Sequence, residues 1–116
     1  MEHVTLYHNP ACSHSRAALG LLQERGVAFA TIEYLKTPPD RAALEQICDR
    51  LGEPLSELVR KDKRFAELQL NAADYVTRAA VIDLLLAYPE LMQRPIVIRG
   101  ERAVIARPAT LLERLF

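Results

Sequence analysis

The sequence predicts an α/β fold whose mixed sheet is built from two strands at the start of the chain and two near its end. Three observations indicate this fold: a strand–helix–strand pattern over residues 4–34, a helical pattern over about residues 40–90, and a hairpin with a last helix over residues 96–115. With 116 residues, half of them hydrophobic, the chain fits one domain, residues 1–116, that can bury a core without disulfides or a structural metal.

The first unit is predicted from turn and stop signals. Residues 4–7 favour a strand, residues 8–13 form a turn-rich loop, and residues 13–25 carry one apolar helical face that Gly26 ends. Residues 29–34 can then return as a second strand. A crossover of this length makes the two strands parallel neighbours with the helix on one face.

The rest of the chain is predicted as helices followed by a hairpin. Asp40 and Thr77 are expected to cap helices, with short helical segments between them. Gly100 lies between two short apolar runs, which indicates an antiparallel hairpin, and Pro108 suits the first turn of a last helix. The order βαβ, helices, ββα is that of a thioredoxin-like fold with a helical insertion at about residues 40–90.

The composition limits the classes of binding partner and the cellular compartment that fit this chain. Fifteen Lys and Arg balance fifteen Asp and Glu, which argues against a surface for nucleic acid. Two cysteines are too few for a disulfide framework, the first residues show no secretory signal, and no apolar run reaches the ~18–20 residues of a membrane span. We therefore expect a cytoplasmic protein with no membrane contact, and a monomer. The histidines and cysteines lack the paired spacing of a zinc site, so we expect no bound metal or other cofactor.

Cys12 is the candidate nucleophile. It lies where the loop meets the first predicted helix, and the unpaired N–H groups and positive dipole end there favour a thiolate. The same N–H groups form a site for an anion. A cysteine that attacks a tetrahedral oxyanion needs both features at one place, because the substrate must approach a negatively charged sulfur.

Polar neighbours of Cys12 offer further hydrogen bonds. His8 could supply a positive charge or a hydrogen bond to the sulfur, and Asn9, Ser13 and Ser15 could donate to the loop or the thiolate. Asn9 and Ser15 are also candidate substrate-binding residues. Ordinary turn and capping chemistry explains Asn9 and Ser13 at least as well.

The second cysteine is predicted to be structural. Ser15 stands where a Cys-x-x-Cys motif would have its second cysteine, so no disulfide can close within the loop. Cys48 lies between Ile47 and Leu51 of an amphipathic helix, which favours a small core residue over a resolving thiol. Dithiol chemistry would have to use Cys48 or an external thiol.

Three arginines stand in special local settings, and the setting of Arg94 could place it near the loop of Cys12. Arg94 precedes Pro95, which can hold a cis peptide at the start of a strand, and Arg107 precedes Pro108 at the end of the hairpin. Arg60 follows a short apolar pair. The planar guanidinium suits an oxyanion, although each arginine taken alone is more typical of a solvated surface.

Residues 8–16, with the sequence His-Asn-Pro-Ala-Cys-Ser-His-Ser-Arg, resemble the active-site signature of the glutaredoxin-coupled arsenate reductase (ArsC) family. The blocks at residues 34–39, 58–60, 93–96 and 107–108 resemble later blocks of that family in the same order. Ala106 stands where the family usually has glycine. The end at Phe116 resembles the shorter branch of the family, which is related to the Spx-like thioredoxin-fold proteins.

This resemblance implies a thioredoxin-like fold and a reaction. Cys12 would attack arsenate, His8 would lower the pKa of Cys12, and the arginines would hold the oxyanion and its reduced product. By the same resemblance these arginines are Arg60, Arg94 and Arg107. Glutathione would act as co-substrate and attack arsenic, and glutaredoxin would resolve the mixed species and release arsenite.

Two other functions are available on this fold. A general glutathione-dependent thiol-disulfide reductase would use Cys12 without needing all three arginines. An Spx-like regulator that binds RNA polymerase often carries a Cys-x-x-Cys switch, which Ser15 removes. Arsenate reduction is the function that fits these residues best.

Overall fold

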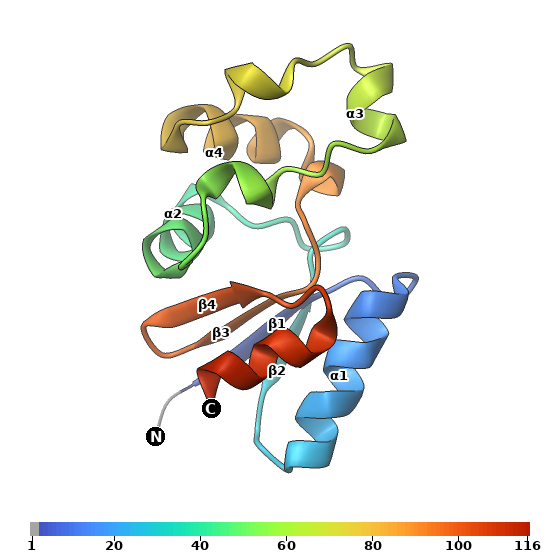
Figure 1. The fold of residues 1–116 in the computed structure, drawn as a ribbon, viewed down its shortest axis with the longest axis vertical. Coiled ribbons are helices and arrows are strands. Elements are labelled where there is room, and N and C mark those ends of the chain that lie inside the picture. Colours follow the sequence, from blue (N-terminus) through green and yellow to red (C-terminus); the bar gives the residue numbers. More distant parts are fainter. Residues whose placement is uncertain (1–2) are drawn as a thin grey trace.

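The computed structural model describes residues 3–116 and places a four-stranded sheet between two groups of helices (Figure 1). The strands are β1 (Val4–His8), β2 (Ala30–Glu33), β3 (Ile96–Arg99) and β4 (Arg102–Ile105). The α-helices are α1 (Ser13–Arg25), α2 (Arg41–Arg50), α3 (Lys63–Glu67) and α4 (Arg78–Ala87). The 3-10 helices are η1 (Leu55–Leu58), η2 (Ala72–Asp74), η3 (Pro89–Leu91) and η4 (Ala109–Leu115). The predicted order of βαβ, helices and ββα is confirmed.

The sheet is mixed, with the strand order β2-β1-β3-β4. β1 and β2 are parallel because α1 carries the chain back between them, and Tyr7 lies opposite Ile32. β3 is antiparallel to both of its neighbours, β1 and β4. The predicted hairpin joins β3 and β4, and Gly100 takes a left-handed φ of 58° in its turn.

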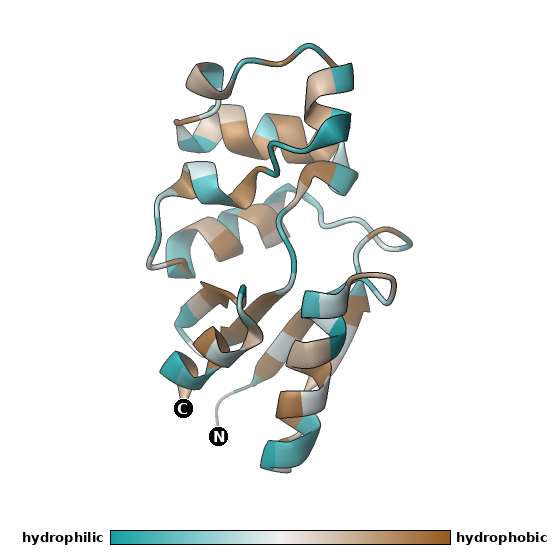
Figure 2. Cartoon of the chain, turned by 45° about the vertical axis from the view of Figure 1, so that its right-hand side comes forward, coloured by the Kyte–Doolittle hydropathy of each residue, from teal (hydrophilic) through white to brown (hydrophobic). Residues whose placement is uncertain are grey.

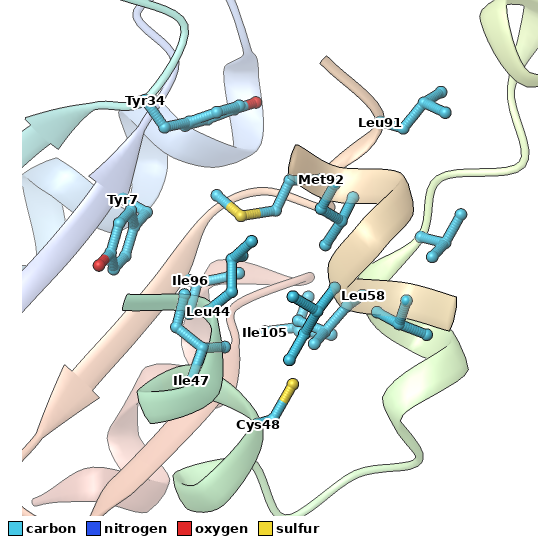
Figure 3. Close-up of a cluster of buried hydrophobic side chains, with 14 of the residues drawn as sticks. Tyr7, Tyr34, Leu44, Ile47, Cys48, Leu58, Leu91, Met92, Ile96 and Ile105 are labelled. Carbon is cyan, nitrogen blue, oxygen red and sulfur yellow. The ribbon is translucent and has the colours of Figure 1, made fainter. Parts of the chain in front are cut away.

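Alternation along the strands divides the core into two clusters, since neighbouring residues such as Leu6 and Tyr7 point to opposite faces. The α1-side cluster joins the sheet to α1 and η4 through Val4, Leu6, Ala18, Leu22, Val97, Val104 and Leu112. The insertion-side cluster joins the sheet to the helices of residues 40–91 through Tyr7, Tyr34, Leu44, Ile47, Leu85, Met92, Ile96 and Ile105 (Figure 3). Figure 2 shows hydrophobic residues along the strands and on α4, as a two-sided core requires.

The predicted helix boundaries follow from local chemistry. The side chain of Asp40 accepts a hydrogen bond from the N–H of Ala43 at the start of α2, and Thr77 accepts one from Ala80 at the start of α4. Gly26 ends α1 with a left-handed φ of 70°. These three signals are confirmed.

Two elements differ from their predicted form. β2 stops at Glu33, because the carbonyl of Glu33 accepts the N–H groups of Lys36 and Thr37 at 2.9 Å and turns the chain. The last segment is the 3-10 helix η4, in which the N–H of Leu111 donates to the carbonyl of Pro108. The turn after β2 also releases Tyr34 from the strand.

No helix within residues 3–116 combines the length and the apolar character needed to cross a lipid bilayer.

Candidate active site

Four strand ends meet at one edge of the sheet. The carboxyl ends of β1 and β2 lie together because the strands are parallel, and the amino end of β3 joins them because β3 is antiparallel to β1. The carboxyl end of β4 lies beside it, with Ile105 opposite Ile96. The topology therefore brings the loop at residues 9–12, Tyr34, residues 94–95 and residues 106–107 to one place.

The loop after β1 presents Cys12 at the N-cap of α1. Its backbone is extended there (φ −96°, ψ 125°), as is usual for an N-cap residue, so the sulfur lies at the N-terminal end of the helix. Asn9 shapes the loop: its side-chain Oδ1 accepts from the N–H of Ala11 at 3.0 Å, and its carbonyl accepts from the N–H of Cys12 at 2.9 Å. The buried hydroxyl of Ser15 accepts from the N–H of Asn9 at 3.3 Å. Asn9 thus has the turn role that the sequence left open.

The environment of Cys12 favours its thiolate. Burial alone would raise the pKa of the thiol, but hydrogen bonds from the backbone N–H of Ser15, the side chain of Arg94, the backbone N–H of His14 and the hydroxyl of Ser15 together lower it to about 7. Cys12 is only 9% exposed, so these donors act on a sulfur that is largely shielded from water. Cys12 therefore has a larger thiolate fraction at neutral pH than an ordinary thiol.

Arg94 and Arg107 belong to two segments that a main-chain hydrogen bond holds together. The N–H of Ala106 donates to the carbonyl of Pro95 at 2.9 Å, which joins the segment before β3 to the segment after β4. Nη1 of Arg107 lies 3.9 Å from Sγ of Cys12 and donates to the carbonyl of Arg94 at 3.0 Å. The peptide bonds Arg94–Pro95 and Arg107–Pro108 are both cis, as expected for the first.

Arg60 reaches the same edge from the helical insertion. The N–H of Gln93 donates to the carbonyl of Leu58 at 2.7 Å, and the N–H of Arg60 donates to the carbonyl of Leu91 at 2.8 Å. This short main-chain pairing holds Arg60 beside the segment that carries Arg94. Nε of Arg60 lies 3.2 Å from a carboxylate oxygen of Asp62.

The three arginines concentrate positive charge at this edge. Burial lowers the pKa of Arg60, and the like charges of Arg94 and Arg107 lower it further, while Asp62 opposes them. Nη1 of Arg60 and Nε of Arg94 are buried without a hydrogen-bond partner. Buried charged donors are costly to leave unpaired, so this arrangement is complementary to an anion.

His8 is a buried histidine whose surroundings disfavour the charged imidazolium. It ends β1 with only 6% of its surface exposed, and burial lowers its pKa; the charge of Arg16 adds to this effect, whereas that of Glu33 opposes it. The groups that lower the pKa of Cys12 are donors of Ser15, Arg94 and His14. Nδ1 of His8 is buried and has no partner.

Cys48 is a core residue, as predicted. It is 5% exposed within the insertion-side cluster, and burial raises its pKa, so its thiol is protonated and unreactive at neutral pH (Figure 3). Both cysteines are free. In the part of the chain that the structure describes, no three His, Cys, Asp or Glu side chains come together in a way that could hold a metal ion.

Sequence reasoning did not single out Tyr34 or the backbone of His14. Tyr34 occurs within a block that resembles the arsenate reductase family, but only the turn after Glu33 brings it to the edge of the sheet. The N–H of His14 donates to the thiolate because it lies in the first turn of α1, which the position of Cys12 at a helix start could have indicated.

Comparisons with known proteins agree with this geometry. The pattern of the ArsC family matches residues 7–114. The chain belongs to the ArsC family. An arsenate reductase of Neisseria meningitidis is 38% identical over 115 residues, which cover 97% of each chain. The arsenate reductase of Escherichia coli K12 is 37% identical over 110 residues, which cover 94% of this chain and 77% of that protein.

Solved structures of ArsC relatives share the fold. An arsenate reductase from Vibrio cholerae superposes with a TM-score of 0.88 at 31% identity, covering 99% of this chain and 98% of that chain. A putative arsenate reductase from Yersinia pestis superposes with a TM-score of 0.84 at 32% identity, covering 96% of this chain and 98% of that chain. The family resemblance and the thioredoxin-like fold of the sequence prediction are confirmed.

Proposed function

We propose that this ArsC-family protein is an arsenate reductase in which the Cys12 thiolate attacks arsenic. The observation that carries the proposal is a thiol with a pKa of about 7 beside arginines whose buried donors have no partner. The names of the relatives from Neisseria meningitidis and Escherichia coli support the substrate.

The first step forms an arsenic–sulfur bond. The thiolate sulfur supplies the electron pair, one arsenate oxygen leaves as water after taking up protons, and arsenic remains in the +5 state. Arg94 and Arg107 flank the sulfur and would stabilise the charge on the remaining oxygens, with Arg60 on the side of the insertion. Asn9 and Ser15 support this step by holding the loop, and Ser15 also by stabilising the thiolate.

Reduction would require external thiols, since Cys48 lies in the core. Glutathione would replace a second oxygen of the adduct and release water. The thiolate of glutaredoxin would then attack the glutathione sulfur, so that the electron pair of the arsenic–sulfur bond stays on arsenic and reduces it to the +3 state. Hydrolysis of the remaining Cys12–arsenic bond releases arsenite and the free thiol.

A cavity beside Arg107 supports a thiol co-substrate of the glutathione type. Its volume is about 440 Å³, and its charged lining consists of Glu53, Glu57, Arg107 and Arg114. Glutathione carries one ammonium and two carboxylates, and this cavity offers partners for both charges. Arg107 lines this cavity and also lies 3.9 Å from the sulfur of Cys12, so one side chain links the cavity to the reacting residue.

The test is arsenate-dependent NADPH oxidation coupled through glutathione reductase, glutathione and glutaredoxin. We expect turnover in the wild type and none in Cys12→Ser. If folded protein with a reduced Cys12 reduces a small disulfide but not arsenate, the general thiol reductase replaces this proposal. The cytoplasmic location and the monomeric state stay predictions.

A further inference from the structure

Tyr34 combines complete burial with a hydroxyl proton that has no acceptor. The residue is 0% exposed, and among the described residues its O–H finds no group to which it could donate. Buried tyrosine hydroxyls usually find one, because leaving the group unpaired costs free energy. Packing in the core would be served equally well by phenylalanine. We therefore look for the partner of the hydroxyl in a bound ligand.

The position of Tyr34 aims this hydroxyl at the active-site edge. The ring packs in the insertion-side cluster, and Figure 3 shows it at the margin of that cluster, on the side opposite Cys48. Tyr34 follows β2 directly, and the turn made by the carbonyl of Glu33 takes it out of the strand. It therefore lies at the carboxyl end of β2, next to the end of β1 that leads to Cys12.

The polar groups around the hydroxyl are those of the active site. Burial raises the pKa of Tyr34, while the charges of Arg94 and Arg60 and hydrogen bonds from the Arg94 and Asn9 side chains to the phenolic oxygen act in the opposite direction. The phenol therefore stays protonated at neutral pH and can donate. Four side chains of the site hold buried polar atoms without a partner, namely Tyr34, His8, Arg60 and Arg94.

We propose that Tyr34 is a substrate-binding residue whose hydroxyl donates a hydrogen bond to the oxyanion held by Arg60 and Arg94. This inference rests on the proposed function. A neutral donor suits the position because the pKa of Arg60 is already lowered by its cationic neighbours, and a further buried cation would add to that repulsion. The hydroxyl adds a bond to the anion without adding charge.

The test is Tyr34→Phe, read as protection of Cys12 by arsenate against iodoacetamide in the absence of glutathione. We expect the arsenate concentration that halves the alkylation rate to rise about tenfold, since a hydrogen bond to a charged group is lost. The alkylation rate without arsenate should keep its pH midpoint. The matched control is Tyr7→Phe, a buried tyrosine of the same cluster on the neighbouring strand, which should leave the protection unchanged.

Each other outcome is decisive. Equal protection in the wild type and Tyr34→Phe overturns the inference and leaves the proposed function standing. A shifted pH midpoint of Cys12 in Tyr34→Phe means that Tyr34 acts through the thiol and not on the anion, which also overturns it. Absence of protection by arsenate in the wild type overturns the proposed oxyanion site itself, and the inference with it.

Discussion

The reactivity of Cys12 depends on a few hydrogen-bond donors, and only some of them can be removed by substitution. Two are backbone N–H groups of the first turn of α1, which any sequence in that helix would supply. The other two are side chains, the guanidinium of Arg94 and the hydroxyl of Ser15. Only these two can be removed by substitution without rebuilding the helix.

The hydroxyl of Ser15 should therefore set part of the pH dependence. In the wild type the rate of Cys12 alkylation should rise with pH through a midpoint of about 7, because the thiolate is the reactive form. Ser15→Ala removes a donor that lowers the pKa, so the midpoint should move to higher pH and the rate at pH 6.5 should fall. Ser13→Ala, with an exposed side chain in the same turn, is the control and should match the wild type. An unchanged midpoint in Ser15→Ala would contradict this assignment.

Single residues of the site differed in how well the sequence revealed them. Cys12 could be identified because a polar loop before a helix start is a local signal. Tyr34 could not, because in the sequence it reads as the last residue of a strand, and its role depends on the turn after Glu33. For His8 the sequence left open a positive charge or a hydrogen bond to the sulfur, and its burial, a property of the whole sheet, disfavours the charged form.

Among the elements, helix starts were the most predictable because a cap needs only residues within one turn. Asp40 and Thr77 each bond to the N–H of the residue three positions later. The position of Arg60 in space was not predictable, because it depends on hydrogen bonds between residues far apart in the sequence. The N–H of Gln93 donates to the carbonyl of Leu58, and the N–H of Arg60 donates to the carbonyl of Leu91. No local pattern encodes that pairing.

The cap of α4 should have a measurable effect on stability. Thr77→Ala removes the bond to the N–H of Ala80 and should lower the free energy of unfolding by about 1 kcal/mol, as chemical denaturation would show. Thr77→Ser keeps a hydroxyl at the cap and should retain most of that stability. Cys12 alkylation should be the same in all three proteins, because Thr77 is exposed and lies outside the site. A loss in Thr77→Ser equal to that in Thr77→Ala would mean that the methyl group, and not the cap, is responsible.

On the scale of the whole molecule, the two cysteines occupy separate environments. Cys12 lies at the sheet edge among donors that favour its thiolate, whereas Cys48 lies in the core, where burial raises its pKa. The charged groups that act on Cys48, namely Arg78, Glu45 and Asp49, belong to α2 and α4, and none of them acts on Cys12. Contact between the two sulfurs would require the core cluster to open.

Thiol titration should separate the two residues. In the native protein a disulfide reagent such as DTNB should react promptly with one thiol per chain, and with the second only after denaturation. Cys48→Ala should keep the arsenate-dependent turnover of the wild type when glutathione and glutaredoxin are present. Loss of turnover in this variant, with a circular dichroism spectrum that shows the helix content of the wild type, would identify Cys48 as a resolving thiol instead.

The place of β3 in the sheet has a consequence for the protein during its synthesis. β3 is made late in the chain but lies in the middle of the sheet, next to β1, and only Pro95 separates it from Arg94. A chain still emerging from the ribosome therefore carries Cys12 long before it has Arg94 or Arg107. Until translation is nearly finished that cysteine is a more ordinary thiol, and it gains its full acidity only when the last hairpin closes the sheet.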